Sequence, residues 1–200
     1  MGPGKDEIPA IMFPEFLSAE DANRSFLKPQ DRVIGFTSEG IAKAYPVKIL
    51  NWHEIVNDRV ADQYIAITFC PLCGTGMVCD ANLPRGKLTF GVSSLLYQSD
   101  ILLYDHQTKS LWSQIMSEAV TGPLTGTHLT LLPSTQTTWQ KWQNKYPQTL
   151  VLSDQTGFKR DYSRDPYEGY DKIPRLMFNV DESSNRQQPF KMRPVKNYPR

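Results

Sequence analysis

Three cysteines lie close together in the chain and are the residues best suited to do chemistry. They are Cys70, Cys73 and Cys79, which all fall within ten residues. An odd number of clustered cysteines does not fit the paired framework of a disulfide-rich secreted domain. The cluster therefore predicts one local chemical site.

The first two cysteines belong to the sequence Cys-Pro-Leu-Cys-Gly, which directly follows a predicted strand, and two kinds of site fit it. In a metal knuckle, two thiolates face one ion and a glycine after the second cysteine relieves the strain of the turn. In a thioredoxin-type redox site, the first cysteine, here Cys70, begins a helix whose dipole lowers its pKa. Gly74 and Gly76 are poor residues with which to start a helix, which favours the metal interpretation.

A metal site needs ligands beyond Cys70 and Cys73. His53, in the sequence Asn-Trp-His-Glu, is the expected third ligand, because the carboxylate of Glu54 and the aromatic neighbour could fix its tautomer. Two thiolates and one imidazole suit copper(I), or zinc with an open fourth position. Cys79 is expected to be a packed and unreactive thiol.

Further polar residues are expected to line this site, together with Glu54. They are Lys43, Tyr97, Ser99, Asp100 and Gln114. Tyr97, Ser99 and Asp100 follow a predicted strand, so their polar groups could face a pocket near the cysteines. Lys43 could balance buried thiolates, and a buried Gln114 would need hydrogen-bond partners.

Two other kinds of site find little support. A Ser-His-Asp triad can be written with Ser93, His53 and Asp100, but no Gly-x-Ser-x-Gly elbow supports a hydrolase. The Gly-Val-Ser-Ser stretch at 91–94 lacks the spacing of a phosphate-binding loop, so no nucleotide cofactor is expected.

The elements that must hold these residues predict an α+β domain that is mainly antiparallel β with a few short helices. Short apolar runs separated by turn residues are typical of strands, and no long alternation of strands and helices predicts a doubly wound parallel sheet. Expected helices span 18–27, 49–57 and 134–146. Expected strands span 31–36, 41–47, 63–69, 77–81, 87–93, 101–105, 111–114, 118–122 and 128–132.

One core domain is expected at 18–162, preceded by an extended lead-in at 1–17. The proline-rich stretch 163–200 is expected to be a tail that packs on the core or is partly disordered.

Composition excludes several partners. The 200 residues include 22 Lys and Arg against 21 Asp and Glu, a formal net charge of +1. Nucleic acids and anionic membranes select for a basic excess, so neither is expected as the main partner. The longest apolar runs are as long as a strand, and no transmembrane segment is expected. A protein or a small molecule remains as the possible binding partner.

Several words of the sequence together resemble a bacterial and archaeal family catalogued as domain of unknown function 3179. These words include Asn-Trp-His-Glu-Ile-Val-Asn-Asp at 51–58 and Cys-Pro-Leu-Cys-Gly-Thr at 70–75. Further words are found at 42–46, 90–97, 99–100, 111–114, 122–124 and 132–134, and Asp-Pro-Tyr at 165–167 is another. So many words in the same order make the resemblance specific, over roughly residues 5–170.

The resemblance implies a site region but no established reaction. It also implies a periplasmic or extracellular setting, because family members often follow a leader or membrane anchor. The first residues here contain no apolar run typical of a leader, so the cytoplasm stays open as the alternative. Members usually have glycine where this chain has Ser94.

The sequence thus predicts an uncharacterised domain that binds copper or zinc through Cys70, Cys73 and His53. One alternative is a thiol-disulfide oxidoreductase in which Cys70 and Cys73 are catalytic and the pKa of Cys70 is lowered. Another is a non-catalytic structural or interaction module. Whether the chain is an enzyme is left open.

Overall fold

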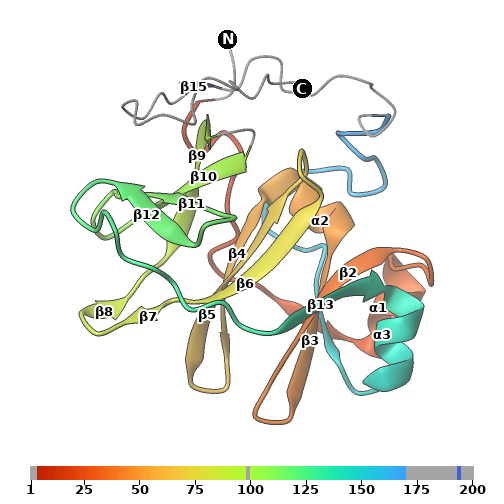
Figure 1. The fold of residues 1–200 in the computed structure, drawn as a ribbon. Coiled ribbons are helices and arrows are strands. Elements are labelled where there is room, and N and C mark those ends of the chain that lie inside the picture. Colours follow the sequence, from red (N-terminus) through yellow and green to blue (C-terminus); the bar gives the residue numbers. More distant parts are fainter. Residues whose placement is uncertain (1–3, 98–99, 170–192, 195–200) are drawn as a thin grey trace.

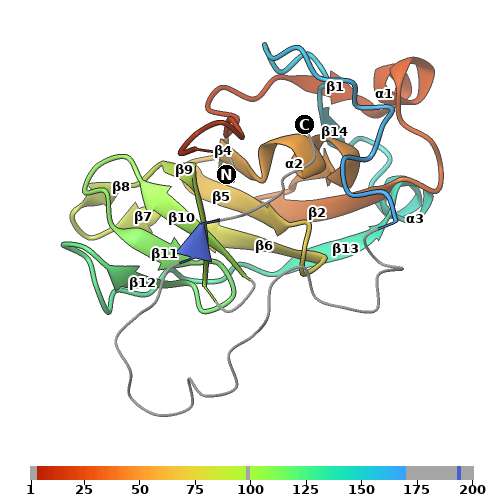
Figure 2. The same ribbon diagram turned by 90° about the horizontal axis from the view of Figure 1, so that it is seen from above.

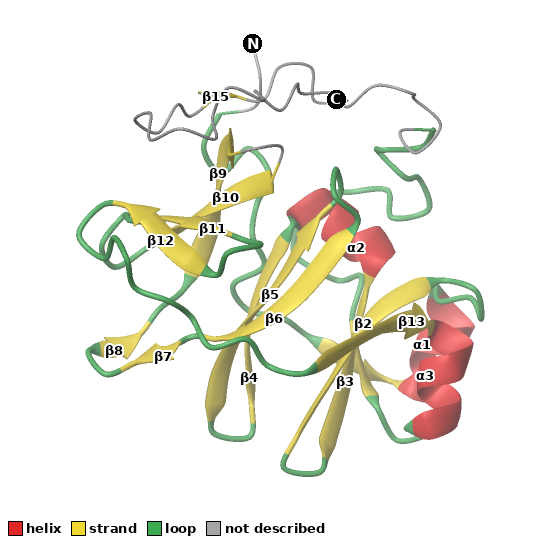
Figure 3. Ribbon diagram, in the orientation of Figure 1, coloured by secondary structure: helices red, strands yellow, loops and turns green. Residues whose placement is uncertain are grey.

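The computed structural model describes residues 4–97, 100–169 and 193–194. Three short helices and a series of strands follow one another along the described chain (Figures 1 and 3). The helices are α1 (Ala19–Ser25), α2 (Val47–His53) and α3 (Trp139–Lys145). The strands are β1 (Phe16–Ser18), β2 (Arg32–Ser38), β3 (Ile41–Pro46), β4 (Ile55–Val60), β5 (Gln63–Cys70), β6 (Thr75–Asp80), β7 (Asn82–Leu83), β8 (Gly86–Lys87), β9 (Phe90–Tyr97), β10 (Asp100–Asp105), β11 (Leu111–Ser113), β12 (Glu118–Thr121), β13 (Ser134–Thr138), β14 (Leu150–Leu152) and β15 (Arg193–Pro194).

The expected α+β class, mainly antiparallel β, is confirmed. Two five-stranded sheets have the orders β1-β14-β3-β2-β13 and β12-β11-β10-β9-β15. A three-stranded sheet, β4-β5-β6, lies between them, and β7 and β8 form a small ribbon (Figure 2). Among these paired strands only β14 and β3 run parallel. Within the described residues, no helix is long and apolar enough to cross a membrane.

The middle sheet is buried on both faces, which explains the nearly continuous apolar sequence of β5. Ile65, Ile67 and Phe69 belong to a core cluster shared with β2, β3 and α2. Ala66 and Cys70, which alternate with them, belong to a second cluster shared with β9, β10 and β11. Because successive side chains of a strand point to opposite faces, β5 carries Cys70 towards the second five-stranded sheet.

One of the three helices, α1, lies where the sequence predicts it, and the other two have boundaries that differ from the predicted ones. Ser18 caps α1, and its side chain accepts a hydrogen bond from the backbone N–H of Asp21 (3.1 Å). The helix expected at 49–57 ends at His53, and β4 follows at once. The helix expected at 134–146 begins only at Trp139, because 134–138 pairs with β2 as strand β13.

Strand β9 contains a β-bulge opposite Leu102 and Leu103 of β10. Leu95 pairs with Leu102 while Val92 pairs with Leu103, so Ser93 and Ser94 are extra residues in β9. Ser94 has φ +60°, a left-handed conformation that favours glycine, which is the residue usual at this position in the family that the sequence resembles. Its Oγ donates a hydrogen bond to the Gly4 carbonyl (2.7 Å).

Candidate functional site

The two cysteines of the Cys-Pro-Leu-Cys-Gly sequence sit on the turn that joins β5 to β6. Cys70 is the last residue of β5, and the backbone N–H of Cys73 donates to the Cys70 carbonyl and to the Cys70 Sγ, both at 3.2 Å. Gly74 has φ +65°, which a side chain would strain. Strand β6 begins directly after it at Thr75. No helix follows Cys73, so no helix dipole acts on either thiol.

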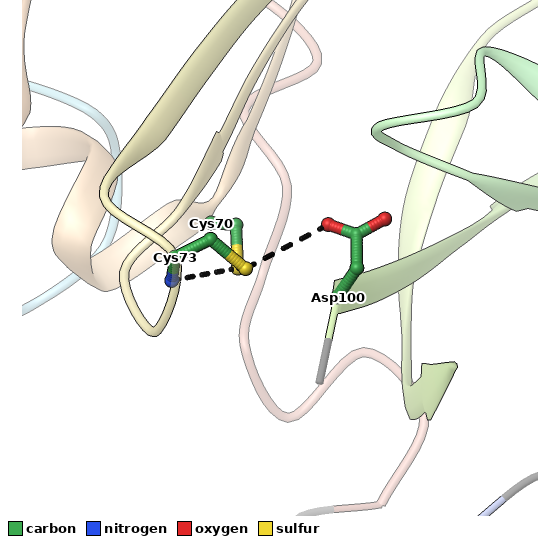
Figure 4. Close-up of side chains that lie close together, drawn as sticks. All are labelled: Cys70, Cys73 and Asp100. Atoms are coloured by element: carbon green, nitrogen blue, oxygen red, sulfur yellow. Dashed lines mark hydrogen bonds between the residues drawn. The ribbon is translucent and has the colours of Figure 1, made fainter. Parts of the chain in front are cut away.

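The two sulfur atoms lie 2.7 Å apart and differ in environment (Figure 4). Cys70 is buried and Cys73 is exposed. The hydrogen bond that Cys70 donates to Cys73, together with burial, raises the pKa of the Cys70 thiol. The same hydrogen bond lowers the pKa of Cys73, against the opposing effects of partial burial and the Asp100 carboxylate. Of the pair, Cys73 is therefore the more readily ionised and the more accessible thiol.

Asp100 faces the cysteines from the neighbouring sheet, at the start of β10 (Figure 4). Its Oδ1 lies 3.9 Å from the Cys73 Sγ. Its Oδ2 accepts hydrogen bonds from the backbone N–H of Ile115 (3.0 Å) and the hydroxyl of Ser113 (3.3 Å). Burial raises the pKa of Asp100. Atoms of Cys70, Cys73 and Asp100 that could bind a metal all lie within 4.8 Å of one another.

Gln114 joins the same two sheets beside the cysteine turn. Its side chain is 2% exposed, and Nε2 donates to the Thr68 hydroxyl (3.0 Å) and to the Thr75 carbonyl (3.1 Å). Thr75 pairs with Cys70 across the β5–β6 hairpin. The Oε1 of Gln114 has no hydrogen-bond partner among the residues that the structure describes. A buried amide oxygen of this kind favours a bound water or ligand atom beside it.

The structure does not place His53 with the two sulfur atoms, contrary to the expectation of a third ligand. His53 is fully buried, with Nδ1 2.7 Å from the Pro9 carbonyl and Nε2 2.6 Å from the Tyr162 hydroxyl. Since a carbonyl only accepts, Nδ1 carries the proton and Nε2 accepts from Tyr162. Burial lowers the pKa of His53 to about 4, so the ring is neutral. Its two nitrogens are used to hold the segments around residues 9 and 162.

Glu54 lies beside the cysteine turn as expected, and a tyrosine that the sequence analysis missed joins it. The Glu54 carbonyl accepts from the backbone N–H of Phe69 (2.8 Å), the residue before Cys70. The Glu54 side chain is 3% exposed and hydrogen-bonded to Tyr167, and burial raises the pKa of its carboxyl to about 8. The charge of Cys70 acts on Tyr167, which places this tyrosine at the site. The Asp-Pro-Tyr word of the family resemblance was the available signal.

The segment that carries Tyr167 is attached to α2. Asn51 Nδ2 donates to the carboxylate of Asp165 (3.0 Å), and the indole N–H of Trp52 donates to the Arg164 carbonyl (3.1 Å). The same Asp165 carboxylate accepts from the backbone N–H of Tyr167 (2.9 Å). The Asn-Trp-His-Glu and Asp-Pro-Tyr words therefore meet in space, more than a hundred residues apart in sequence.

The other residues singled out from the sequence differ in their surroundings. Lys43 forms a buried ion pair with Asp58 (2.7 Å) and donates to the Arg59 carbonyl, so it does not balance the thiolates. Burial raises the pKa of Cys79 to about 11, in line with an unreactive thiol. Tyr97 ends β9 and pairs with Asp100.

Two further expectations concern serines. Ser99 lies outside the described residues. The Ser93 hydroxyl donates to the Leu102 carbonyl, and both His53 nitrogens are engaged, so Ser93, His53 and Asp100 form no triad.

Cys73 lines a cleft of about 1180 Å³. Pro71, Leu72 and Gly74 of the same turn contribute to its wall, as does Tyr167. The remaining lining comes from Phe69, from residues between 25 and 51 and from residues between 154 and 169. The exposed thiol is therefore reached through a concave surface.

Comparison with known families decides what the chain is related to. The model of the family described as protein of unknown function DUF3179 matches residues 5–195. The chain belongs to the DUF3179 family. Searches of the curated proteins and of the solved structures found no match. The family carries no assigned reaction, so the function has to be argued from the site itself.

Proposed function

We propose that Cys70 and Cys73 form a redox-active dithiol that exchanges with a disulfide substrate. The sulfur–sulfur distance of 2.7 Å carries this proposal. Two thiolates that share a tetrahedral zinc ion, with Zn–S bonds of about 2.3 Å, stand about 3.8 Å apart. A disulfide bond is about 2.05 Å long. The pair is thus closer to the separation of bonded sulfurs than to that of two metal ligands.

The environments of the two thiols support different roles for them in the exchange. Cys73 is exposed in the cleft and its pKa is lowered, which suits the attacking thiolate. Cys70 is buried behind it with a raised pKa, which suits the thiol that closes the disulfide afterwards. This assignment reverses the redox alternative drawn from the sequence, which expected the lowered pKa at Cys70.

The exchange needs no co-reactant beyond the substrate disulfide. The Cys73 thiolate attacks one substrate sulfur, forms a mixed disulfide and releases the other half of the substrate as a thiolate. Cys70 then loses its proton, attacks the Cys73 Sγ and releases the second half. The substrate is reduced to two thiols, the cysteine pair is oxidised to a disulfide, and the two thiol protons end on the products.

Asp100 is suited to hold a proton during this exchange. Its Oδ1 is 3.9 Å from the Cys73 Sγ, while its other oxygen is fixed by Ile115 and Ser113. Burial raises the pKa of Asp100, which brings its proton affinity nearer to that of a thiol. The family resemblance supports an extracytoplasmic setting, where disulfide exchange is common.

Metal binding is the second candidate, and the approach of Asp100 to both cysteines favours it. Thiolates with one carboxylate suit zinc, and thiolates alone suit copper(I). In this candidate Asp100 takes the place that the sequence analysis gave to His53. The two sulfurs would have to separate by about 1 Å to share a tetrahedral ion.

Thiol chemistry on the full chain tests the redox proposal. An oxidant disulfide should produce one intrachain disulfide in the parent protein and in Cys79→Ala, and none in Cys70→Ala or Cys73→Ala. Cys70→Ala should accumulate a mixed disulfide at Cys73. The proposal fails if Cys73 reacts no faster than Cys79, or if no intrachain disulfide forms.

Elemental analysis separates the two candidates. Protein purified without chelator should contain no stoichiometric zinc or copper if the site is a dithiol. A full equivalent of either metal that is lost in Cys70→Ala, Cys73→Ala and Asp100→Ala, and kept in Cys79→Ala, would overturn the redox proposal in favour of metal binding.

A further inference from the structure

The shape of the cleft limits what can reach the attacking thiol. Cys73 contributes to the lining of a cleft of about 1180 Å³. Clefts of this order hold small molecules and short peptides. A disulfide on the surface of a folded protein would have to enter the cleft to meet the sulfur. This geometry favours a substrate of low molecular weight.

One wall of the cleft carries an excess of positive charge. We call the lining residues between 25 and 51 the N-terminal wall; it holds the cations Lys28, Arg32 and Lys48 and the single carboxylate Asp31. That carboxylate is already engaged, by Lys48 Nζ at 2.6 Å and by the backbone N–H of Lys28 at 2.7 Å. Arg32 has no ion pair with any described residue.

Arg32 is the cation of this wall that contacts the cysteine turn. Its guanidinium donates to the Gly74 carbonyl (3.4 Å), next in sequence to Cys73, and lies 5.8 Å from the centre of the Phe69 ring. An arginine held in this way presents further N–H groups to the cleft in the fork that suits a carboxylate.

A second wall carries an excess of negative charge. We call the lining residues between 154 and 169 the C-terminal wall; four carboxylates face two arginines on it. Asp165 is engaged by Asn51, and Asp161 by Ser163. For Glu168, by contrast, the described residues provide no ion pair and no side-chain hydrogen bond. The lining of the cleft therefore carries a net positive charge in its residues between 25 and 51 and a net negative charge in its residues between 154 and 169.

We infer that the substrate of the dithiol is a small disulfide of amino-acid or short-peptide type, carrying both carboxylate and ammonium groups. The inference rests on the proposed redox function. Arg32 binds a substrate carboxylate beside the reacting sulfur, and Glu168 on the other wall binds an ammonium group. The substrate disulfide is reduced to two thiols while Cys70 and Cys73 become joined, by the exchange set out above.

Four disulfides that carry different charged groups test this substrate class. Oxidised glutathione carries both charges, dithiodiglycolate carries carboxylates, cystamine carries ammonium groups and 2-hydroxyethyl disulfide is neutral. The rate of oxidation of the reduced full chain is measured with each and divided by its rate with free 2-mercaptoethanol, which removes the intrinsic reactivity of each probe. Oxidised glutathione should give the highest normalised rate, and added salt should reduce its advantage.

Charge-removing variants assign the two walls. Arg32→Gln should slow the carboxylate-bearing disulfides by about threefold, and Glu168→Gln the ammonium-bearing ones by a similar factor, as expected for exposed ion pairs. Each should slow the disulfides that carry the opposite charge more than it slows the neutral disulfide. Arg85→Gln and Glu39→Gln remove the same charges outside the cleft and should leave every rate unchanged.

The results separate this inference from the function on which it rests. Equal normalised rates for the charged and neutral disulfides would overturn the substrate class while leaving the dithiol function standing. Loss of the neutral rate in Arg32→Gln would show that arginine acts on the turn and not on the substrate, which also overturns it. Failure of every disulfide to oxidise Cys73 would instead refute the dithiol function.

Discussion

The buried carboxyl of Glu54 makes the stability of the protein depend on pH in a defined direction. Burial raises the pKa of Glu54 from an ordinary value of 4.5 to about 8. The folded protein therefore holds a proton that the unfolded chain releases once the pH exceeds about 4.5. The free energy of unfolding should fall as the pH rises through this window, and level off above about 8.

The magnitude follows from the two pKa values. Each tenfold change in proton affinity is worth about 1.4 kcal/mol, so the shift from 4.5 to about 8 corresponds to roughly 5 kcal/mol across the window. Glutamine mimics the neutral acid and can keep the hydrogen bond with Tyr167. Glu54→Gln should therefore remove this dependence and be the more stable protein at the alkaline end.

Urea unfolding followed by tryptophan fluorescence measures this prediction at several pH values under reducing conditions. Glu39→Gln is the matched control, because Glu39 lies exposed in the β2–β3 turn and its substitution should leave the parent profile intact. If Glu54→Gln and the parent lose stability equally between the two ends of the window, the buried carboxyl is not the group that titrates, and the reasoning is wrong.

Substitutions at three positions test the packing that holds the site, each measured by urea unfolding. Asn57→Ala should cost about 2–4 kcal/mol, because Asn57 satisfies both the N–H (2.7 Å) and the carbonyl (2.8 Å) of buried Phe90; a loss below about 1 kcal/mol would contradict this. Ser94→Val should cost about 2 kcal/mol at φ +60°, whereas Ser94→Gly should change stability by less than about 1 kcal/mol; equal effects would refute the backbone argument. Gly35→Ala should cost about 1–3 kcal/mol and perturb the near-ultraviolet circular dichroism, because a Cβ there would lie 2.3 Å from the Trp142 ring; an unchanged spectrum and stability would show that the ring can move away freely.

The fold class and the cysteine turn of the candidate site could be predicted from sequence because both depend on local patterns. Alternation and turn residues indicate antiparallel strands, and the glycines at 74 and 76 disfavour a helix after Cys73. Element boundaries were less predictable where tertiary pairing decides. The Thr-rich stretch at 134–138 is a strand and not part of a helix, because it pairs with the edge of β2. Ile55 and Val56, predicted to be helical, instead pair with β5.

The neighbours of the site residues could not be read from the sequence, because they come from distant segments. The sequence around His53 does not indicate that its Nε2 accepts a hydrogen bond from Tyr162, 109 residues away, and is therefore not available to a metal. Nor does the sequence show that Asp100, and not an imidazole, would face Cys73, since their contact depends on how two separate sheets pack. The family resemblance marked the Asp-Pro-Tyr word without revealing that its tyrosine reaches Glu54.

The two halves of the site belong to different sheets, and this has a consequence for how the site responds to distant changes. Cys70 and Cys73 are fixed to the β4-β5-β6 ladder, whereas Asp100 and Gln114 follow the β9–β12 ladder. No backbone ladder of the described chain links these two sheets, so the distance between Cys73 and Asp100 depends on the side-chain contacts that pack one sheet against the other. Its stiffness is set by contacts such as the Asn57–Phe90 clamp. The rate at which Cys73 reacts should consequently change when core substitutions alter the packing of the two sheets, even where the substituted residue contacts neither cysteine.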